Sequence, residues 1–358
     1  DSINGIKAGY AAGMKVIHIP DTIEINDDIR SLTSVVCHSL SDVPDIIDTW
    51  NEGKVVDIEG YYENAKINRV YVDRVHVKKA FAEYTAAYNA DDPKIKLKID
   101  HTYRVAALCE RIAKAAGMCA YDVELAWLSG MLHDVGRFEQ IKRYNTFSDA
   151  DSVDHAKFGA DLLFKDGLIS TFLKGMVKCT GYKPGALEDR YDSDGVFLYD
   201  RLNKSDMEML ELAIRCHNMY RIPQGLNCRE QAFCNVLRDA DKVDIFKVNI
   251  DTPLEEIYNT TTEELMKSDI TDEVLEAFDE EHCILKAIRR TPADTVIGHV
   301  SLAYELVYDE SVRITVEQGY LAKLMHFHSD NEETNRKMAM VREKMDSYVK
   351  KRIVEKDA

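Results

Sequence analysis

The chain has 358 residues, of which 45% are apolar or aromatic, so it has enough material to bury a substantial core and the length of about two domains. Lys and Arg total 46 against 63 Asp and Glu, and the formal net charge of −17 argues against broad binding to nucleic-acid polymers or anionic membranes. The eight cysteines form no CxxC pair, and no apolar run reaches the ~18 residues of a membrane span, so we expect a reduced, cytoplasmic protein that does not enter a membrane.

The first fifty residues alternate between helical and strand patterns. Ser2 is a good N-cap for a helix over Ile3–Met14, and KVIHIP at Lys15–Pro20 is typical of a short buried strand. Ser34–Cys37 predicts a second strand, and Val43–Trp50 predicts a helix after it. Residues 1–50 are therefore expected to form a small α/β fragment.

The stretch DSINGIKAGYAAGMKVIHIPD resembles the last conserved block of haloacid dehalogenase-like (HAD) phosphatases of the phosphoglucomutase type, over about residues 1–50. The resemblance implies that an acid at the position of Asp1 helps to hold magnesium. The family's nucleophilic aspartate, its Ser/Thr and its lysine belong upstream of this block, so we do not expect HAD catalysis from these residues. Apolar strands of this kind need cover on both faces, and we expect the fragment to pack on the other domain, to form a homodimer, or to be poorly ordered.

Residues 51–76 are polar, rich in Tyr and without a clear period, and we interpret them as a linker with one short strand at Val70–Val72. Helical periodicity dominates residues 77–358, so the predicted fold class is mainly α, with one helical domain over 77–358. The predicted helices are Val75–Tyr88, Lys98–Ala116, Glu124–Val135, Asp154–Gly167, a helix opened by the capping box Ser205/Glu208, Arg229–Phe246, Glu273–Arg289, Ser301–Tyr308, Ser311–Leu324 and Glu332–Arg352.

Metal-binding side chains recur on the apolar faces of these helices. His133 and Asp134 are adjacent in WLSGMLHDVGRFEQ, and His101, His155 and His217 each fall on the apolar stripe of another helix. Taken singly, a histidine on an apolar face is usually a core residue with a hydrogen-bond partner. Several titratable groups that point inward together are costly to bury, and a shared divalent cation removes much of that cost.

Two acids are candidates for a further ligand. Asp241 shares a helix face with Phe233 and Leu237, whereas Asp239 lies on the opposite side of the same helix, so periodicity alone does not choose between them. Imidazole nitrogen with carboxylate oxygen suits iron, manganese, zinc, nickel or cobalt far better than calcium.

The order of these residues resembles the HD-domain superfamily of metal-dependent phosphohydrolases, in the version with two additional histidines. The matching text is KIDHTYRVA, LSGMLHDVGRFEQ, SVDHAKFGADLL, IRCHNMYRIPQG and RDADKVDIF, over about residues 77–250. The resemblance implies that His101, His133, Asp134 and Asp241 hold one metal, that His155 and His217 hold a second, and that Asp134 bridges both. Asn218 follows His217 and no GYP text is present, so cyclic-di-GMP is not assigned as the substrate.

The leading functional prediction is hydrolysis of a small phosphoester, such as a nucleotide or a sugar phosphate, at a centre of two transition-metal ions. Asp134, Arg137 and Lys242 are the predicted catalytic residues, the two cations because they adjoin ligands and can neutralise phosphate charge. Arg104 and Lys157 also adjoin ligands but are expected to make surface ion pairs.

Other residues receive a position only. Tyr144, Phe147 and Asp149 lie on the loop between two ligand helices and are predicted to line the pocket. His299, His326 and His328 have no matching partners in the sequence and are predicted to be surface residues; they are not expected to take part in the site.

Two alternatives stay open at this stage. HD-type proteins with six such ligands include mixed-valent di-iron oxygenases that cleave C–C or C–P bonds. A third possibility is a nucleotide-sensing module that binds at its metal site without turnover.

Overall fold

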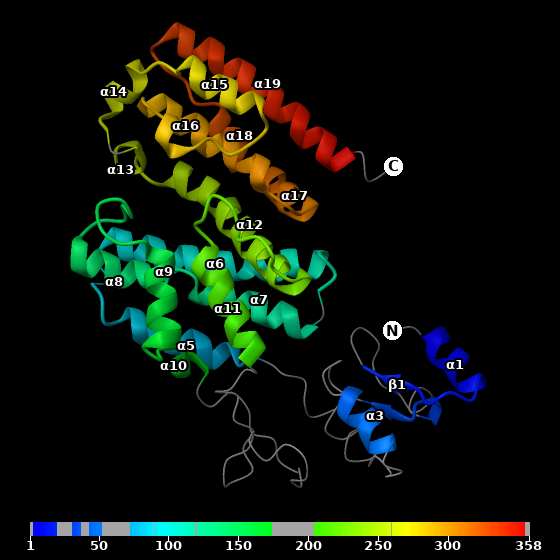
Figure 1. Ribbon diagram of the computed structural model, residues 1–358. Helices are drawn as coiled ribbons and strands as arrows, with labels where there is room; N and C mark the ends of the chain where they lie inside the picture. The colour runs from blue at the N-terminus through cyan, green and yellow to red at the C-terminus, as the bar shows by residue number, and fades with distance from the viewer. Residues whose placement is uncertain are drawn as a thin grey trace. The chain divides into compact units, whose positions relative to one another are not determined.

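The structure is a computed structural model, and the following describes residues 3–19, 31–36, 43–51, 72–89, 91–118, 120–173, 204–258 and 260–354. Among these residues helices predominate and strands are few, which confirms the predicted mainly-α fold class (Figure 1). The chain divides into two compact units, one of residues 1–82, 118–125 and 169–204 and the other of residues 83–117, 126–168 and 205–358. No helix in the described ranges has the length and apolar character needed to cross a membrane.

The N-terminal fifty residues contain the predicted elements in shortened form. Helices α1 (Ile3–Ala11) and α3 (Val43–Asn51) accompany strands β1 (Ile17–His18) and β2 (Val35–Val36). The two strands pair in parallel, with Ile17 opposite Val35. Buried Val35 and Ile46 form a small apolar cluster there. Asp1 and most of the predicted linker lie outside the described residues.

The described helices between residues 74 and 216 are α5 (Arg74–Thr85), α6 (Pro93–Ala115), α7 (Ala120–Leu132), α8 (Val135–Tyr144), α9 (His155–Ala160), the π-helix η2 (Asp161–Lys165), α10 (Ile169–Leu173) and α11 (Lys204–Cys216). Helix α6 starts earlier than predicted, because the Asp92 carboxylate caps it by accepting from the Lys94 backbone N–H and Pro93 occupies its first turn. The predicted helix Asp154–Gly167 changes from α to π winding at Asp161.

The longest helix is α12 (Cys228–Asp251), which opens with a capping box of Asn227 and Glu230. It is packed on two sides: α6 lies along one, and η5, α17 and α18 lie along the other (Figure 1). The elements that follow it are α13 (Leu254–Tyr258), α14 (Thr262–Lys267), α15 (Asp272–Asp279), the 3₁₀ turn η4 (Lys286–Ile288), α16 (Pro292–Val300), the 3₁₀ helix η5 (Ser301–Glu305), α17 (Asp309–Gln318), α18 (Tyr320–Met325) and α19 (Glu332–Val354).

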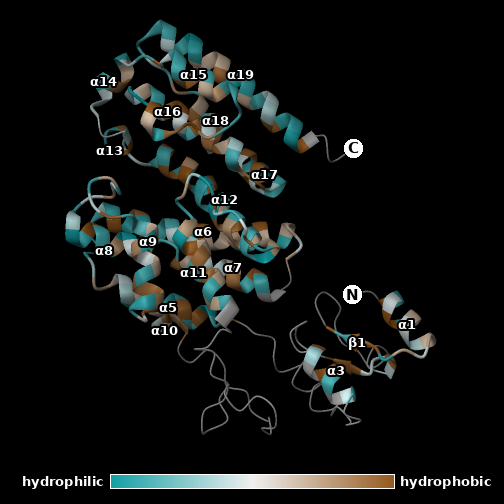
Figure 2. Ribbon diagram, viewed as in Figure 1, coloured by the Kyte–Doolittle hydropathy of each residue, from teal (hydrophilic) through white to brown (hydrophobic). Residues whose placement is uncertain are grey.

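These C-terminal helices share one apolar core, which contains Phe246 of α12 as well as Phe278, Ile297, Leu321 and Met345. Their outer faces are hydrophilic, most visibly along α19 (Figure 2). Helix α12 therefore belongs to two packed layers, which explains why acids on both of its faces are buried.

The boundaries in this part differ from the prediction. The helix predicted over Ser301–Tyr308 is present only as the 3₁₀ helix η5, which ends at Glu305. The α-helix α16 lies just before it and opens with a capping box of Thr291 and Asp294. The prediction that His299 is a surface residue is wrong, because α16 carries it into partly buried contact with the Tyr258 ring, 5.6 Å between centroids. His326 and His328 are exposed, as predicted.

Candidate metal centre

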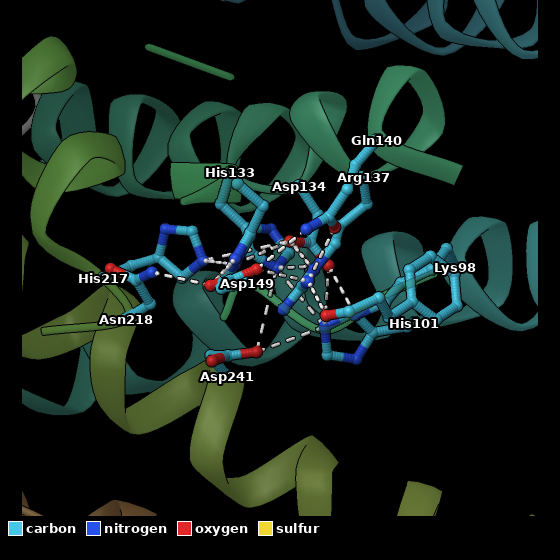
Figure 3. Close-up of polar contacts among 12 residues, drawn as sticks. Lys98, His101, His133, Asp134, Arg137, Gln140, Asp149, His217, Asn218 and Asp241 are labelled. Carbon is cyan, nitrogen blue, oxygen red and sulfur yellow. Dashed lines mark hydrogen bonds and ion pairs between the residues drawn. The ribbon is translucent and has the colours of Figure 1, made fainter. Parts of the chain in front are cut away.

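Five segments bring the predicted ligands together (Figure 3). His101 projects from α6 and Asp241 from α12, while His155 is the first residue of α9. His133 and Asp134 lie between α7 and α8 rather than inside one helix as predicted, because α7 ends at Leu132 and Asp134 has non-helical backbone angles (φ −106°, ψ 14°).

A close contact between two glycines sets the distance between α8 and α9. A Cβ on Gly136 would lie 2.4 Å from the His155 carbonyl oxygen and 2.7 Å from the Gly159 nitrogen. The backbones of α8 and α9 therefore approach each other closely at Gly136 and Gly159. The two glycines let His155 lie beside the HD pair, because any larger residue at position 136 overlaps backbone atoms.

The first group of donors, called the His101 side here, consists of His101, His133, Asp241 and one oxygen of Asp134. The Nε2 atoms of His101 and His133 are 3.3 Å apart, and each is 3.6 Å from Asp134 Oδ2. Asp241 Oδ1 lies 3.1 Å from His101 Nε2 and 3.8 Å from His133 Nε2. Asp239, the other candidate acid, instead accepts hydrogen bonds from the Val307 and Tyr308 backbone N–H groups.

The second group, called the His155 side, consists of His155, His217 and the other oxygen of Asp134. The Nε2 atoms of the two histidines are 3.0 Å apart and lie 3.5 Å and 3.9 Å from Asp134 Oδ1. Donor atoms that share a cation at about 2.0–2.2 Å stand about 3–3.5 Å apart. Both groups thus have the spacing of a coordination shell, and the four histidines and Asp134 are all buried.

The hydrogen bonds of the Nδ1 atoms show that these groups fit a metal. His133 Nδ1 donates to the Gly130 carbonyl, and His217 Nδ1 donates to the Ile214 carbonyl, both at 2.7 Å. His155 Nδ1 donates to Asp149 Oδ2 at 2.7 Å. In neutral imidazoles this leaves the Nε2 lone pairs of His155 and His217 facing each other, an arrangement that a cation between them satisfies.

Residues 99–246 match the HD-domain family model. The match includes all six predicted ligands and confirms the HD part of the resemblance. No curated protein and no solved structure matches the chain. The resemblance of residues 1–50 to HAD-like phosphatases gains no support from the comparisons and stays a prediction.

Each side of the HD centre contains one histidine backed by an Arg–Asp pair. His101 Nδ1 donates to Asp244 Oδ2 at 2.6 Å, and Arg104 binds both oxygens of Asp244, at 2.6 and 2.9 Å. On the other side, Arg137 binds Asp149 at 2.9 Å. Such partners fix the ring orientation and the tautomer of a ligating histidine.

His101 differs in its pKa from the other three histidines of the HD centre, since burial also lowers the pKa of His133. Burial, helped by Arg137 for His155 and by His133 for His217, lowers the pKa of both residues to about 4. Burial and Lys98 also act to lower the pKa of His101, but its hydrogen bonds to Asp241 and Asp244 outweigh them and raise it above the usual value. The histidines of the His155 side are thus neutral, as metal ligands must be, near pH 7.

Asp134 is ionised in spite of its burial. Burial acts to raise the pKa of its carboxyl group, but Lys98, His133 and His155 outweigh burial and hold the pKa well below the usual range. The pKa of Asp241 is lowered in the same way, against burial, by its hydrogen bond from His101. Both acids are therefore anionic donors at neutral pH.

The predicted cations occupy different places. Arg137 Nε lies 3.8 Å from Asp134 Oδ1, on the HD centre. Lys242 is buried, its ammonium has no hydrogen-bond partner among the described residues, and burial and Arg238 lower its pKa to about 8. Lys157 pairs with Asp154 on the surface, as expected, whereas Arg104 binds the buried Asp244 beside His101 instead of making a surface ion pair.

Three contacts of the HD centre were missed in the sequence. Lys98 Nζ lies 2.7 Å from Asp134 Oδ2, and its position one turn before His101 was an available signal. Asp244 lies one turn after Asp241 on α12, so the spacing of three also indicated a shared side. Asn218 Nδ2 donates to Asp154 at 2.9 Å and thereby ties the end of α11 to the start of α9.

Proposed function

We propose that the HD domain holds two divalent transition-metal ions and hydrolyses a small phosphoester. The observation that supports this best is the position of Asp134, whose two oxygens face different histidine pairs. His101, His133 and Asp241 would complete one site, and His155 and His217 the other. Two such ions polarise a phosphoryl group and lower the pKa of bound water.

The side chains of the HD centre have distinct proposed roles. Asp134 would hold both ions, since one of its oxygens faces each histidine pair. Arg137, anchored by Asp149, neutralises charge on the phosphoryl oxygens. Lys242 stays the third proposed catalytic residue: Asp241 is one of the charges that act on its ammonium, and a pKa of about 8 suits transfer of a proton near neutral pH.

The charge of the protein supports a small substrate rather than a polymer. The formal net charge is −17, so a nucleic-acid chain would be repelled over most of the surface. The cations that face the HD centre are few and partly buried, and they suffice for one phosphate group. A nucleotide or a sugar phosphate meets this condition.

The proposal is tested by elemental analysis of the purified protein, followed by a screen of phosphoesters with the metal found. We expect about two equivalents of Fe, Mn, Zn, Ni or Co, hydrolysis of at least one class of phosphoester, and loss of turnover after chelation that returns when the metal is restored. Replacement of the exposed Asp151 by Ala, in the loop beside the centre, serves as a control and should change neither metal content nor rate.

Two results would contradict the proposal. A protein with two irons that consumes dioxygen with a polyol or a phosphonate, and leaves phosphoesters intact, is an oxygenase. A protein that binds nucleotides and metal but turns over no phosphoester is a sensing module.

A further inference from the structure

Two cations from different helices reach the same carboxylate. Lys98, on α6, places Nζ 2.7 Å from Asp134 Oδ2, and Arg137, on α8, places Nε 3.8 Å from Asp134 Oδ1 (Figure 3). Because Asp134 is the residue that faces both histidine pairs, each cation lies within reach of a group held at the HD centre. Lys98 is the closer of the two and retains 18% side-chain exposure.

Arg137 is held at one end of its guanidinium group by hydrogen bonds, whereas the other end, Nε, lies near Asp134 without forming one. Its NH1 donates to Gln140 Oε1, the Phe147 carbonyl and Asp149 Oδ1, at 2.8, 2.6 and 2.9 Å. Its Nε is buried and has no hydrogen-bond partner among the described residues. A buried cationic N–H without an acceptor is unfavourable, and a ligand oxygen at this point would satisfy it.

The Phe147 ring lies next to both cations. Its centroid is 5.7 Å from Lys98 Nζ and 5.7 Å from Arg137 Cζ. A ring face attracts cations without taking up their hydrogen bonds, so Phe147 helps to hold both groups in place while their donors stay available. The prediction that Phe147 lines the pocket stays a prediction, and this contact supports it.

Two other cations near the HD centre, Arg104 and Lys157, are already paired, and Lys98 and Arg137 are the two seen to reach the Asp134 carboxylate. Arg104 donates two hydrogen bonds to Asp244, and Lys157 is paired with Asp154 on the surface. Lys98 and Arg137 are thus the pair placed to meet an anion.

The charges of the HD centre select among phosphate esters. With two divalent ions, which rest on the proposed function, the ions, Lys98 and Arg137 contribute six positive charges against three negative ones from Asp134, Asp149 and Asp241. A phosphate monoester brings two negative charges to this excess and a diester brings one. Because the site is buried, the second negative charge of the monoester is attracted strongly by this positive excess, and the diester lacks that attraction.

We propose that Lys98 and Arg137 form a two-point clamp for a dianionic phosphate, which makes the HD centre selective for phosphate monoesters over diesters. Arg137 supplies a fixed N–H from one side of the Asp134 carboxylate, and Lys98 supplies its ammonium from the other. The clamp binds the phosphoryl oxygens through hydrogen bonds and charge and takes no part in bond breaking.

The experiment compares Lys98→Met and Lys98→Arg with the matched control Lys96→Met, an exposed lysine two residues away on α6. Binding of inorganic phosphate to the metal-loaded protein is measured by calorimetry, metal content by elemental analysis, and kcat/KM with p-nitrophenyl phosphate and bis(p-nitrophenyl) phosphate. We expect Lys98→Met to weaken phosphate binding and monoester turnover about a hundredfold, with diester turnover changed about threefold or less and metal content unchanged. Lys98→Arg should recover most of the loss, and Lys96→Met should match the wild type.

The outcomes separate this inference from the proposed function. If the wild type hydrolyses neither ester, the proposed function fails, while the phosphate affinity of Lys98→Met still decides the clamp. An equal loss on both esters, or a loss of metal with phosphate affinity retained per loaded centre, would show that Lys98 only positions Asp134. If Lys98→Met does not fold, Lys98→Gln takes its place with the same expectations. A loss of phosphate affinity and of monoester preference in Lys98→Gln would support the clamp, and wild-type phosphate affinity together with wild-type selectivity in both Lys98→Gln and Arg137→Gln would overturn it.

Discussion

Each side of the HD centre has a histidine pair and a backing acid, the Asp that accepts a hydrogen bond from a histidine Nδ1, but the two backing acids differ in burial. On the His101 side the backing acid Asp244 is buried, with 2% side-chain exposure, and a second carboxylate, Asp241, faces the histidines. On the His155 side the backing acid Asp149 lies in a loop and is 30% exposed. From this difference we predict that the His101 side is the more rigid half and would bind a metal ion more strongly, whereas the position of His155 depends on a loop.

The two sides also differ in how they hold protons. His101 lies between Asp241 and Asp244 and has a raised pKa, so a proton competes with a metal there. His155 and His217 have pKa values of about 4 and offer free nitrogens at neutral pH. The His101 side has more donors, but a proton competes with the metal there. The His155 side has fewer donors and no such competition at neutral pH. We therefore predict that the two sides bind metal with unequal affinities that depend differently on pH.

The largest effect is expected from the residue that both sides share. Asp134→Ala should remove both ions and lower kcat by at least about 10³-fold, because each side loses its anionic oxygen. Elemental analysis and a turnover assay with the phosphoester found for the wild type check this. Retention of one full equivalent of metal by the variant would mean that Asp134 serves a single side.

The next effect concerns the glycine contact that places the His155 side. Gly136→Ala should destabilise the protein by about 2–3 kcal/mol and reduce metal binding on that side, because its Cβ overlaps backbone atoms of α9. Gly159→Ala is the graded comparison: its Cβ would be 3.0 Å from the Gly136 nitrogen, a milder overlap with a smaller cost. Urea unfolding and metal titration measure both, and equal stability of the two variants would argue against the contact.

The residues that meet at the candidate centre were predictable from sequence because inward-facing histidines keep the helical period. His101 and His217 lie on apolar stripes, and the resemblance to the HD superfamily made Asp241 the favoured acid. Periodicity alone did not decide between Asp239 and Asp241, since α12 is packed on both faces. Asp239 is buried as the acceptor for backbone N–H groups of the segment before α17, and Asp241 is partly buried against the histidines.

The contacts between helices were less predictable. Lys98 was overlooked because a lysine beside a ligand is usually a surface residue, and its partner Asp134 lies 36 residues further along the chain. The break at His133 was also missed, since Val135 continues the apolar stripe of Leu128 and Leu132 although a new helix starts there. The mainly helical fold could be predicted because the period of each helix is local, whereas the breaks and contacts depend on packing.

The backing acids provide a direct comparison of the two sides. Asp244→Asn should cost about 2 kcal/mol of stability, because it leaves Arg104 without its buried partner, and should weaken binding of one ion by about 10- to 100-fold. Asp149→Asn should weaken binding of the other ion by a similar factor. It should lower the free energy of unfolding by less than about 1 kcal/mol, since Asp149 is partly exposed. Unfolding of the metal-free variants and stepwise metal titration provide the measurements. Equal stability losses would contradict the asymmetry.

The smallest effect is a pH dependence of opposite sign for His101 and for the two histidines of the His155 side. His155 and His217 have folded pKa values of about 4 against 6.5 in the unfolded chain, so as pH falls from 7 to 6 the unfolded state takes up protons that the folded state does not. Each should therefore cost the metal-free protein about 0.7 kcal/mol over that interval. His101, whose pKa is raised, contributes stability below pH 6.5 that is lost as pH rises through its folded pKa. Urea unfolding at pH 7 and pH 6 measures the stability lost on acidification. His217→Gln should therefore reduce this loss, His101→Gln should increase it, and the exposed His326→Gln should leave it unchanged. The same loss of stability in all three variants would show that the two sides do not differ in their protons.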